Sequence, residues 1–317
     1  MAEGRYADTE AFYRRMLGIS QKLFGVESLK SVIVEERLAT AVKLQGRYEE
    51  AEPLFRHVLA VREHALGAEH SFTAGSMNNL GDLLERERHH SEAEELLRRA
   101  ISVDAKAIGE SNPRIATEAS NLGLLMLRQR RYKEAEPLLR LAVAIDEKSL
   151  PAGHPNIADM LSDLALLLQA QGRYTEAEPL LRRALSIRQY SGPEQPETGM
   201  VLSKLATNLM LQHRFAEADP LFAQALAIEE KTLGTTHPEV AATRRGMADS
   251  AVKQKKWGDA SRQFRIACSV PRSFGSARDL SGDAAQSALY DANSCWIRLS
   301  LSLATWAAEG GGATTED

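Results

Sequence analysis

The stretch GRYTEAEPLLRRALSI, residues 172–187, decides the fold because the chain repeats it. Close copies read GRYEEAEPLFRHVLAV from Gly46, RRYKEAEPLLRLAVAI from Arg130 and HRFAEADPLFAQALAI from His213. A small residue in the middle of each copy returns after 42, 42, 42, 41 and 42 residues, at Ala51, Ala93, Ala135, Ala177, Ala218 and Ala260. A fixed period of this length predicts an array of stacked structural repeats.

A second motif runs in step with the first and completes each repeat. It reads NNLGDLL from Asn78, SNLGLLM from Ser120 and SDLALLL from Ser162. Its small residue stands 12 positions before that of the first motif, at Ala39, Gly81, Gly123, Ala165, Ala206 and Ala248. Apolar residues at helical spacing surround both motifs. Each repeat is therefore predicted to be two helices that approach closely where both carry a small residue.

The joints between these helices carry regular end signals. We call the first helix of each predicted pair the leading helix. Proline stands at its expected first position in four repeats, at Pro113, Pro155, Pro196 and Pro238. The residue before it is expected at or near the cap: Asn112, His154, Gln195 and His237. Proline also recurs in the second helix, at Pro53, Pro137, Pro179 and Pro220. We expect these near the first turn, where a missing amide donor costs little.

Two small residues 12 apart, with a Tyr between them, resemble the tetratricopeptide repeat. The 42-residue period, the Y-x-E-A-E-P-L-x-x-R-A-L motif and the L-G-x-x-H-P joint are similar to its kinesin light chain subfamily. The resemblance covers roughly residues 4–270 and implies an all-α fold, a right-handed superhelix (α-solenoid) of antiparallel helix pairs. No heptad-patterned segment precedes the array. The resemblance therefore implies the fold and the binding mode, but not a role beside a motor.

The phase of the repeat predicts three segments along the chain. Residues 1–270 are expected to form the array, with an unpaired helix at 4–24 followed by six helix pairs. Residues 271–308 are expected to be a loop and a C-terminal capping helix, because terminal repeats are often atypical. Residues 309–317 are expected to be a flexible tail.

Charge and apolar content restrict the partners and the compartment. The net charge is −4, so bulk electrostatics predicts no nucleic-acid partner. No run of about 18 apolar residues occurs, which predicts that no segment spans a membrane. Cys268 and Cys295 are the two cysteines, and they could pair only if the last helices brought them together. We expect reduced thiols and a cytoplasmic location.

The motifs that usually carry catalysis are missing from the sequence: it has no HExxH, GxSxG, P-loop or CxxC pattern. We therefore expect a protein that is not an enzyme, with no catalytic residue, no cofactor and no metal. His89 and His90 are adjacent, but neighbouring side chains on a helix diverge, so they are expected to be solvated turn residues. His70, His154 and His237 recur at joints and are expected to have a structural capping role.

The predicted binding surface lies on the first helix of each repeat, because stacked pairs generate a superhelix with a concave face. Positions two and three before the small residue, and the position after it, point away from the packing seam. The candidate groove residues there are Arg37, Asn78, Asn79, Asp82, Asn121, Asp163, Lys204 and Arg245. In the families that the chain resembles, Asn, Lys and Arg at such positions clamp the backbone or carboxylates of an extended peptide. The alternative reading is a solvated polar face.

Together these features predict a scaffold for a protein or peptide ligand. One alternative is a sensor or regulatory arm of a partner enzyme, such as a protease or a signalling ATPase. Another is a self-associating array, in which residues Tyr6 to Phe24 bury an apolar face against a second chain. The oligomeric state stays open between these alternatives.

Overall fold

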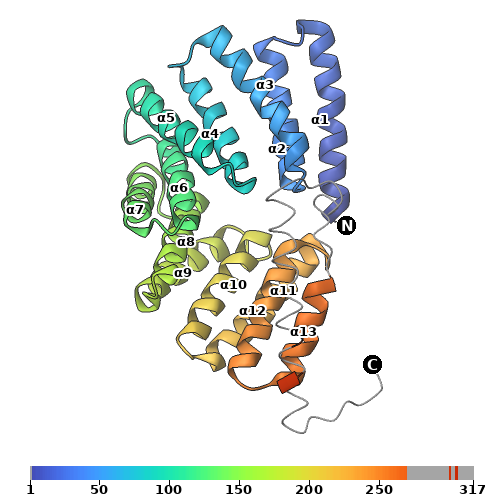
Figure 1. Ribbon diagram of the computed structural model, residues 1–317, viewed down its shortest axis with the longest axis vertical. Helices are drawn as coiled ribbons and strands as arrows, with labels where there is room; N and C mark the ends of the chain where they lie inside the picture. The colour runs from blue at the N-terminus through green and yellow to red at the C-terminus, as the bar shows by residue number, and fades with distance from the viewer. Residues whose placement is uncertain (1, 270–299, 301–303, 306–317) are drawn as a thin grey trace. The chain divides into compact units, whose positions relative to one another are not determined.

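The structure, a computed structural model, describes residues 2–269, 300 and 304–305 (Figure 1). Every regular element in the range 2–269 is an α-helix. The bounds are α1 (Ala2–Phe24), α2 (Leu29–Leu44), α3 (Tyr48–Leu66), α4 (Ser71–Arg86), α5 (His90–Ile108), α6 (Pro113–Arg128), α7 (Tyr132–Ser149), α8 (Pro155–Ala170), α9 (Tyr174–Ser191), α10 (Pro196–Leu211), α11 (Phe215–Leu233), α12 (Pro238–Lys253) and α13 (Trp257–Ser269). The predicted capping helix and tail lie almost wholly outside the described residues.

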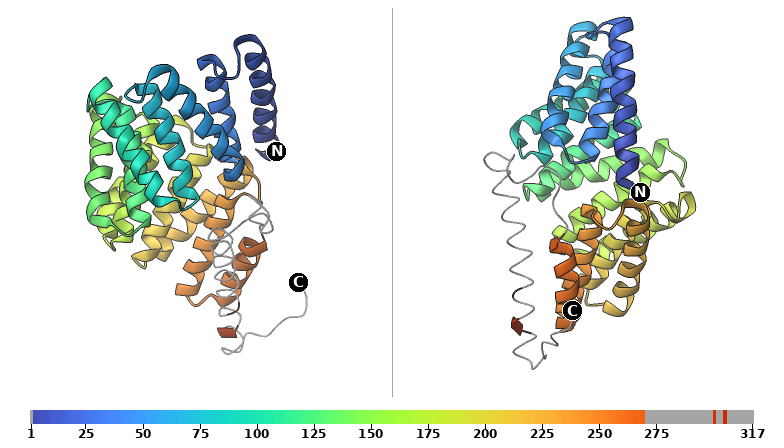
Figure 2. Two further views of the ribbon diagram at one scale, coloured as in Figure 1. Left: turned by 45° about the horizontal axis from the view of Figure 1, so that its top comes forward. Right: turned by 90° about the vertical axis from the view of Figure 1, so that its right-hand side faces the viewer.

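The described chain forms two compact units. The first unit is Ala2–Gln171 with α1–α8, and the second begins at Gly172 and holds α9–α13. Within each unit consecutive helices pack side by side (Figures 1 and 2). The leading helices of neighbouring pairs also touch: α4 contacts α6, α6 contacts α8, and α10 contacts α12. A leading helix therefore has neighbours in its own pair and in the next.

The small residues of the two motifs are buried where the helices of a pair cross. Ala51 and Ala93 have no exposed surface, and neither have Ala39, Ala135, Ala165, Ala177, Ala206, Ala218, Ala248 and Ala260. The two glycines of the series show why. A Cβ at Gly81 would lie 2.8 Å from Leu97 Cγ, and one at Gly123 would lie 2.7 Å from Leu139 Cγ. The predicted close approach of the two helices is confirmed, and it leaves no room for a larger side chain.

The leading helices begin at capped N-termini. His70 Nδ1 accepts a hydrogen bond from Phe72 N at 3.1 Å, and Asn112 Oδ1 accepts one from Arg114 N at 3.0 Å. His154 and His237 cap in the same way, each accepting from the amide two residues on. These side chains satisfy one of the amides that a helix start leaves unpaired. Four of the predicted caps are confirmed, whereas Gln195 makes no side-chain cap bond.

The prolines of the second helices lie deeper than we expected from the sequence. The expectation of a first-turn position is wrong, because α3 already begins at Tyr48 and Pro53 is its sixth residue. Helical hydrogen bonding is in place before it, since Ala51 N bonds Arg47 O at 3.2 Å. Proline there removes one interior hydrogen bond and strains the helix against the preceding carbonyl. The same holds for Pro137, Pro179 and Pro220.

Candidate functional site

The polar residues of the leading helices in the first unit hydrogen-bond one another from repeat to repeat. The bonds run from Asn79 Nδ2 to Glu36 Oε1 at 2.9 Å, from Asn121 Nδ2 to Asn78 Oδ1 at 2.9 Å and from Ser120 Oγ to Asp163 Oδ2 at 2.7 Å. Each bond joins residues 43 positions apart, which is one more than the repeat period. We call these six residues the inter-repeat ladder. Four of them, Asn78, Asn79, Asn121 and Asp163, were predicted as groove residues.

The ladder asparagines keep part of their hydrogen-bonding capacity. An Asn side chain offers two N–H donors and a carbonyl acceptor, and the bonds above use one donor of Asn79 and one of Asn121. Both side chains are partly exposed. Asn78, in contrast, is only 9% exposed, and its side-chain carbonyl accepts the hydrogen bond from Asn121. Asn79 and Asn121 therefore each keep a donor and an acceptor that the ladder does not use, while Asn78 is buried against Asn121.

Asp82 lies beside the ladder in an ion pair with the preceding repeat. Its Oδ2 is 2.7 Å from Lys43 Nζ, and its Oδ1 is 3.6 Å from Arg86 Nε. Burial acts to raise the pKa of Asp82, but the charges of Lys43 and Arg86 outweigh it and lower that pKa below its ordinary value. The carboxylate therefore stays charged at neutral pH and bridges α2 and α4.

The three predicted cations differ in their exposure and in the unit to which they belong. Arg37 on α2 is exposed, and no ion pair joins it to another described residue. Lys204 and Arg245 are partly exposed and belong to the second unit, on α10 and α12. In that unit the neighbouring Ser203 and Thr243 hydroxyls lie 3.0 Å apart. Arg37 is therefore the predicted groove cation of the first unit, and it is more exposed than Lys204 and Arg245.

Behind the ladder lies a buried network that was not predicted from the sequence. Arg62 of α3 is 8% exposed at its side chain, and its Nη2 lies 2.7 Å from Glu36 Oε2. Its Nη1 donates to Ser76 Oγ of α4 at 2.7 Å. Arg62 thus ties Glu36 and the ladder to the core of the repeat. The repeat period placed these residues in register, but only the packing of α3 between α2 and α4 brings their charges together.

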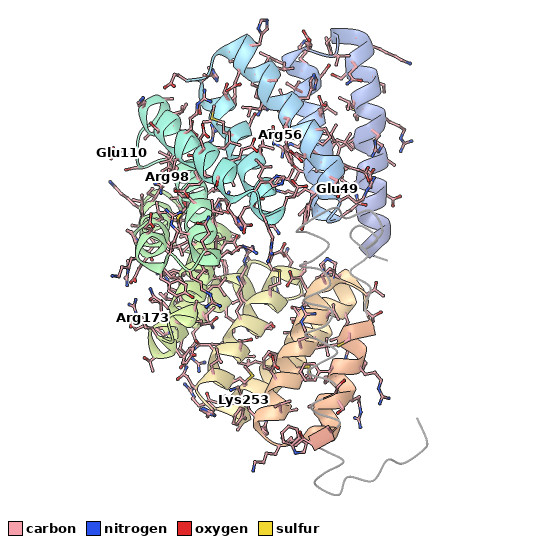
Figure 3. The ribbon with its side chains drawn as sticks, in the orientation of Figure 1. Glu49, Arg56, Arg98, Glu110, Arg173 and Lys253 are labelled. Atoms are coloured by element: carbon pink, nitrogen blue, oxygen red, sulfur yellow. The ribbon has the colours of Figure 1, made fainter. Side chains whose placement is uncertain are left out.

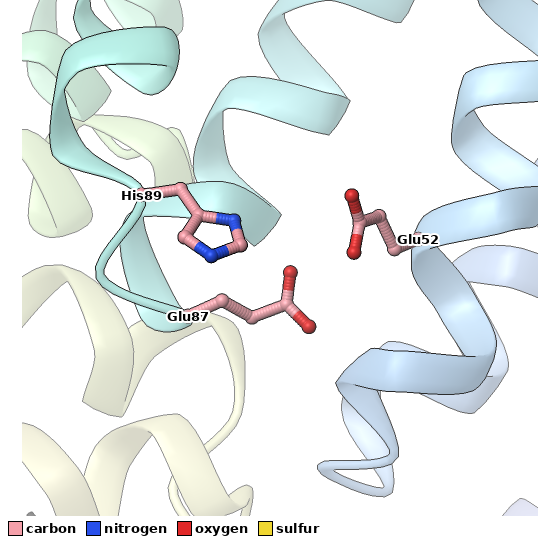
Figure 4. A group of neighbouring side chains, drawn as sticks. All are labelled: Glu52, Glu87 and His89. Atoms are coloured by element: carbon pink, nitrogen blue, oxygen red, sulfur yellow. The ribbon is translucent and has the colours of Figure 1, made fainter. Parts of the chain in front are cut away.

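A second cluster joins α3 to the turn between α4 and α5. Glu52, Glu87 and His89 each direct a ligand-type atom to one point, and these atoms all lie within 4.8 Å of one another (Figure 4). Burial, followed by the charges of Glu52 and Glu49, raises the pKa of Glu87 to about 7. From the sequence, His89 was considered only together with the adjacent His90. Its neighbours in space are Glu87 of the same turn and Glu52 of α3, and this grouping was not predicted.

A surface hollow lies away from both clusters. It has a volume of about 560 Å³ and lies at the turn between α1 and α2, lined by Phe24, Gly25, Val26, Glu27, Ser28 and His57. None of the predicted groove residues lines it, so it gives no support to the predicted groove.

The family of the chain follows from its match to a repeat model. The tetratricopeptide repeat model matches residues 1–63, 31–106, 114–189 and 197–273, and a second model of the same description matches residues 78–149. The chain belongs to the tetratricopeptide repeat (TPR) family. The expected all-α TPR fold is confirmed, because helix pairs fill the described range and the matched repeats coincide with them.

Solved structures of similar TPR proteins agree with the subfamily. BtubC (BKLC) from P. vanneervenii has 21% identity and a TM-score of 0.58, over 72% of this chain and 92% of its own. A Podosopora anserina kinesin light chain with nearly identical TPR-like repeats has 28% identity and a TM-score of 0.51, over 62% of this chain and 94% of its own. A substituted form of that protein gives 27% identity and a TM-score of 0.52, over 63% and 94%. No curated protein matches the chain. The repeats are of the kinesin light chain type.

Two findings bear on the expected compartment. None of the helices in the described part of the TPR chain is both long and apolar enough to cross a bilayer. Cys268 is disulfide-bonded, so the expectation of a reduced thiol is wrong at this position, while Cys295 lies outside the described residues. Because disulfides persist mainly in oxidising compartments, the cytoplasmic location loses one of its supports and stays a prediction.

Proposed function

We propose that this TPR chain is a non-enzymatic scaffold that binds an extended peptide or protein segment along its leading helices. The observation that carries the proposal is the row of partly exposed polar side chains on α2, α4 and α6, repeated at the period of the array. Asn79 and Asn121 retain donors and acceptors that match a peptide backbone. Arg37 adds an exposed cation at one end of that row. The ligand class that fits is an extended peptide with an acidic group near Arg37.

Charge reversal at Arg37 tests this proposal. In binding measurements on an array of extended peptides, Arg37→Glu should weaken acidic ligands by about tenfold or more, which corresponds to the loss of a charge-assisted contact of about 1.4 kcal/mol. Asn121→Ala should weaken acidic and neutral peptides alike, because it removes a backbone contact.

Lys133→Glu is the matched control, since Lys133 is also exposed but lies on α7, a second helix. It makes the same change of charge away from the proposed surface. If Lys133→Glu weakens binding as much as Arg37→Glu does, the loss of affinity depends on the net charge of the protein and not on position, and the groove assignment is wrong. Retention of binding by both Arg37→Glu and Asn121→Ala would place the ligand elsewhere.

A second candidate function is self-association through α1. Phe12, Met16, Ile19 and Leu23 are between 40% and 69% exposed and fall four, three and four residues apart. This spacing forms one apolar stripe of the kind that pairs helices in coiled coils. The helix packs on α2 through another face, where Ser20 Oγ lies 3.2 Å from Ser31 Oγ. Within the described part of the chain the stripe is therefore exposed, and a second copy of the chain is the occupant that we propose for it.

We expect the wild type to sediment as a dimer and the Ile19→Glu, Leu23→Glu double variant as a monomer, because two charges cannot be buried in an apolar seam. Analytical ultracentrifugation at micromolar concentration measures both. The control is Lys22→Glu, which changes a charge on the same helix outside the stripe. A wild type that is monomeric over the whole concentration range would exclude this function.

A further inference from the structure

The turns inside the helix pairs share a contact with an acidic side chain of the preceding repeat. The residue at the N-cap of the second helix is an arginine in four of the pairs. Its guanidinium reaches the acid at 2.6 Å in the pairs Arg47–Glu10, Arg131–Glu94 and Arg214–Glu178. The C-cap glutamine of the leading helix also donates to the acid, from Gln45 to Glu10 at 2.9 Å, from Gln212 to Glu178 at 3.1 Å and from Gln254 to Asp219 at 2.9 Å. Glu10 and Glu178 thus each meet both a guanidinium and an amide donor.

The turn between α4 and α5 departs from this arrangement at both positions. Glu87 stands at the C-cap in place of the glutamine, and His89 stands at the N-cap in place of the arginine. The acid they face is Glu52, which corresponds to Glu10 and Glu94 in the neighbouring repeats. Figure 4 shows the two carboxylates and the imidazole ring converging from α3 on one side and the turn on the other. A site that elsewhere receives an amide donor and a guanidinium here receives a second carboxylate and an imidazole.

Arg56, which also contacts Glu52, does not replace the positive charge of the missing turn arginine. Its Nε lies 2.7 Å from Glu52 Oε1, and its Nη1 lies 2.7 Å from Glu92 Oε1. Figure 3 labels Arg56 and the arginine at the same position of the next repeat, Arg98. Arg98 lies 2.8 Å from Glu94, which also pairs with the turn arginine Arg131. The α4–α5 turn therefore has one cation fewer than its neighbour and one carboxylate more.

One oxygen of Glu87 is buried without a hydrogen-bond donor. Glu87 Oε2 is shielded from solvent and accepts no hydrogen bond from any described residue. A buried carboxylate oxygen without a donor is costly, so such groups are usually paired with a cation or coordinate a metal. This is an observation separate from the convergence of the three side chains, and it favours a positive charge, carried by a proton or a metal ion, between the two carboxylates.

We propose that Glu52, Glu87 and His89 bind a divalent first-row transition-metal ion in the position that the turn arginine occupies in the other repeats. Two carboxylate oxygens and one imidazole nitrogen are a donor set suited to Zn²⁺, with water completing the coordination. Imidazole favours a transition metal over Mg²⁺ or Ca²⁺, which take oxygen ligands. The ion restores the positive charge that the exchange of arginine for His89 removed. It also links α3 of one repeat to the α4–α5 turn of the next, so binding stiffens that joint.

The test uses the full chain, stripped of metal with a chelator and titrated with ZnCl₂ by calorimetry, with thermal melts alongside. We expect one equivalent to bind to the wild type and the Tm to rise with the concentration of Zn²⁺. The control variant, Glu87→Gln with His89→Arg, installs the residues that the Gln212 and Arg214 turn already uses. It should fold without metal, with a Tm at or above that of the metal-free wild type, and should lose this binding event.

Glu52→Gln is a second variant, on the facing helix, and should weaken binding at least tenfold. Both variants retain His70, His154 and His237, so Zn²⁺ bound at those histidines appears equally in all proteins. The proposal is overturned if the wild type binds no Zn²⁺ more tightly than the double variant does. It is also overturned if Glu52→Gln binds as tightly as the wild type, because the ligands must then lie elsewhere.

Discussion

Phe222→Ala should lower the free energy of unfolding of the second unit by about 3–5 kcal/mol, the usual cost of removing a buried aromatic side chain. Phe222 is fully buried on α11. Its ring reaches the next pair, because a Cβ at Gly246 of α12 would lie only 2.7 Å from Phe222 Cε1. The substitution therefore leaves a cavity at the contact of two repeats. In a repeat array the loss should spread to nearest neighbours, and hydrogen exchange should show it on α10–α12.

Tyr190→Ala is the matched control for this prediction. Tyr190 is in the same unit, on α9, but its side chain is 89% exposed. Its removal should change the free energy of unfolding by no more than about 0.5 kcal/mol. Urea unfolding followed by circular dichroism compares the two variants directly. Equal effects of Phe222→Ala and Tyr190→Ala would contradict the packing described here.

The stability of the chain should fall as the pH rises from about 5 to about 8, and Glu118→Gln should flatten this slope. Glu118 is 2% exposed on α6. Burial first, and then the charge of neighbouring Asp104, raise its pKa from 4.5 to about 8 against the opposing effect of Arg114. Arg114 itself lies 3.1 Å from Asp104 Oδ2 and is engaged by that carboxylate. Glu118 is therefore protonated in the folded chain at neutral pH.

The sign of the effect follows from proton uptake in the two states. The unfolded chain loses the Glu118 proton near pH 4.5, while the folded chain keeps it until about pH 8. Between these two pH values unfolding releases a proton. The contribution of Glu118 to the free energy of unfolding is complete below pH 4.5 and falls by up to about 1.4 kcal/mol for each pH unit above it. Urea unfolding at pH 5, 6, 7 and 8 measures the slope of the wild type and of Glu118→Gln.

Glu110→Gln provides the comparison for the Glu118 variant, because it makes the same substitution at an exposed position just before α6. It should leave the pH slope as it is in the wild type. The assignment fails if Glu118→Gln and the wild type lose stability in parallel over this range.

The architecture of each repeat could be derived from the sequence because its signals are local and periodic. Ala51 and Gly123 are small for a reason that their spacing already indicates, namely the close crossing of two helices. His154 and Asn112 cap helices because a polar side chain next to a proline satisfies a free amide. Pro53 was misplaced because the start of α3 depends on the turn that precedes it, and helix ends are the least reliable part of a sequence prediction.

Contacts between repeats could not be derived in the same way. The sequence identified Asn78 and Asn121 as polar positions on leading helices, but it gave no sign that they bond to each other. The two bonded asparagines are 43 residues apart, whereas the repeat period is 42. The difference depends on the relative shift and rotation of neighbouring helix pairs, which the period does not determine. For the same reason Glu52 could not be connected with His89, 37 residues later.

The sequence alone determined that this chain is an array of helix pairs, where each pair begins and which small residues lie at each crossing. These properties depend on helical periodicity, capping and side-chain volume, all of which act within about one turn or one pair. Only the tertiary structure decided which polar side chains are exposed and which form hydrogen bonds or ion pairs with each other, because burial and charge pairing depend on side chains from different repeats. Arg37 is left exposed, Asn78 is buried against Asn121, and Glu87 faces Glu52 where a neighbouring turn places an arginine.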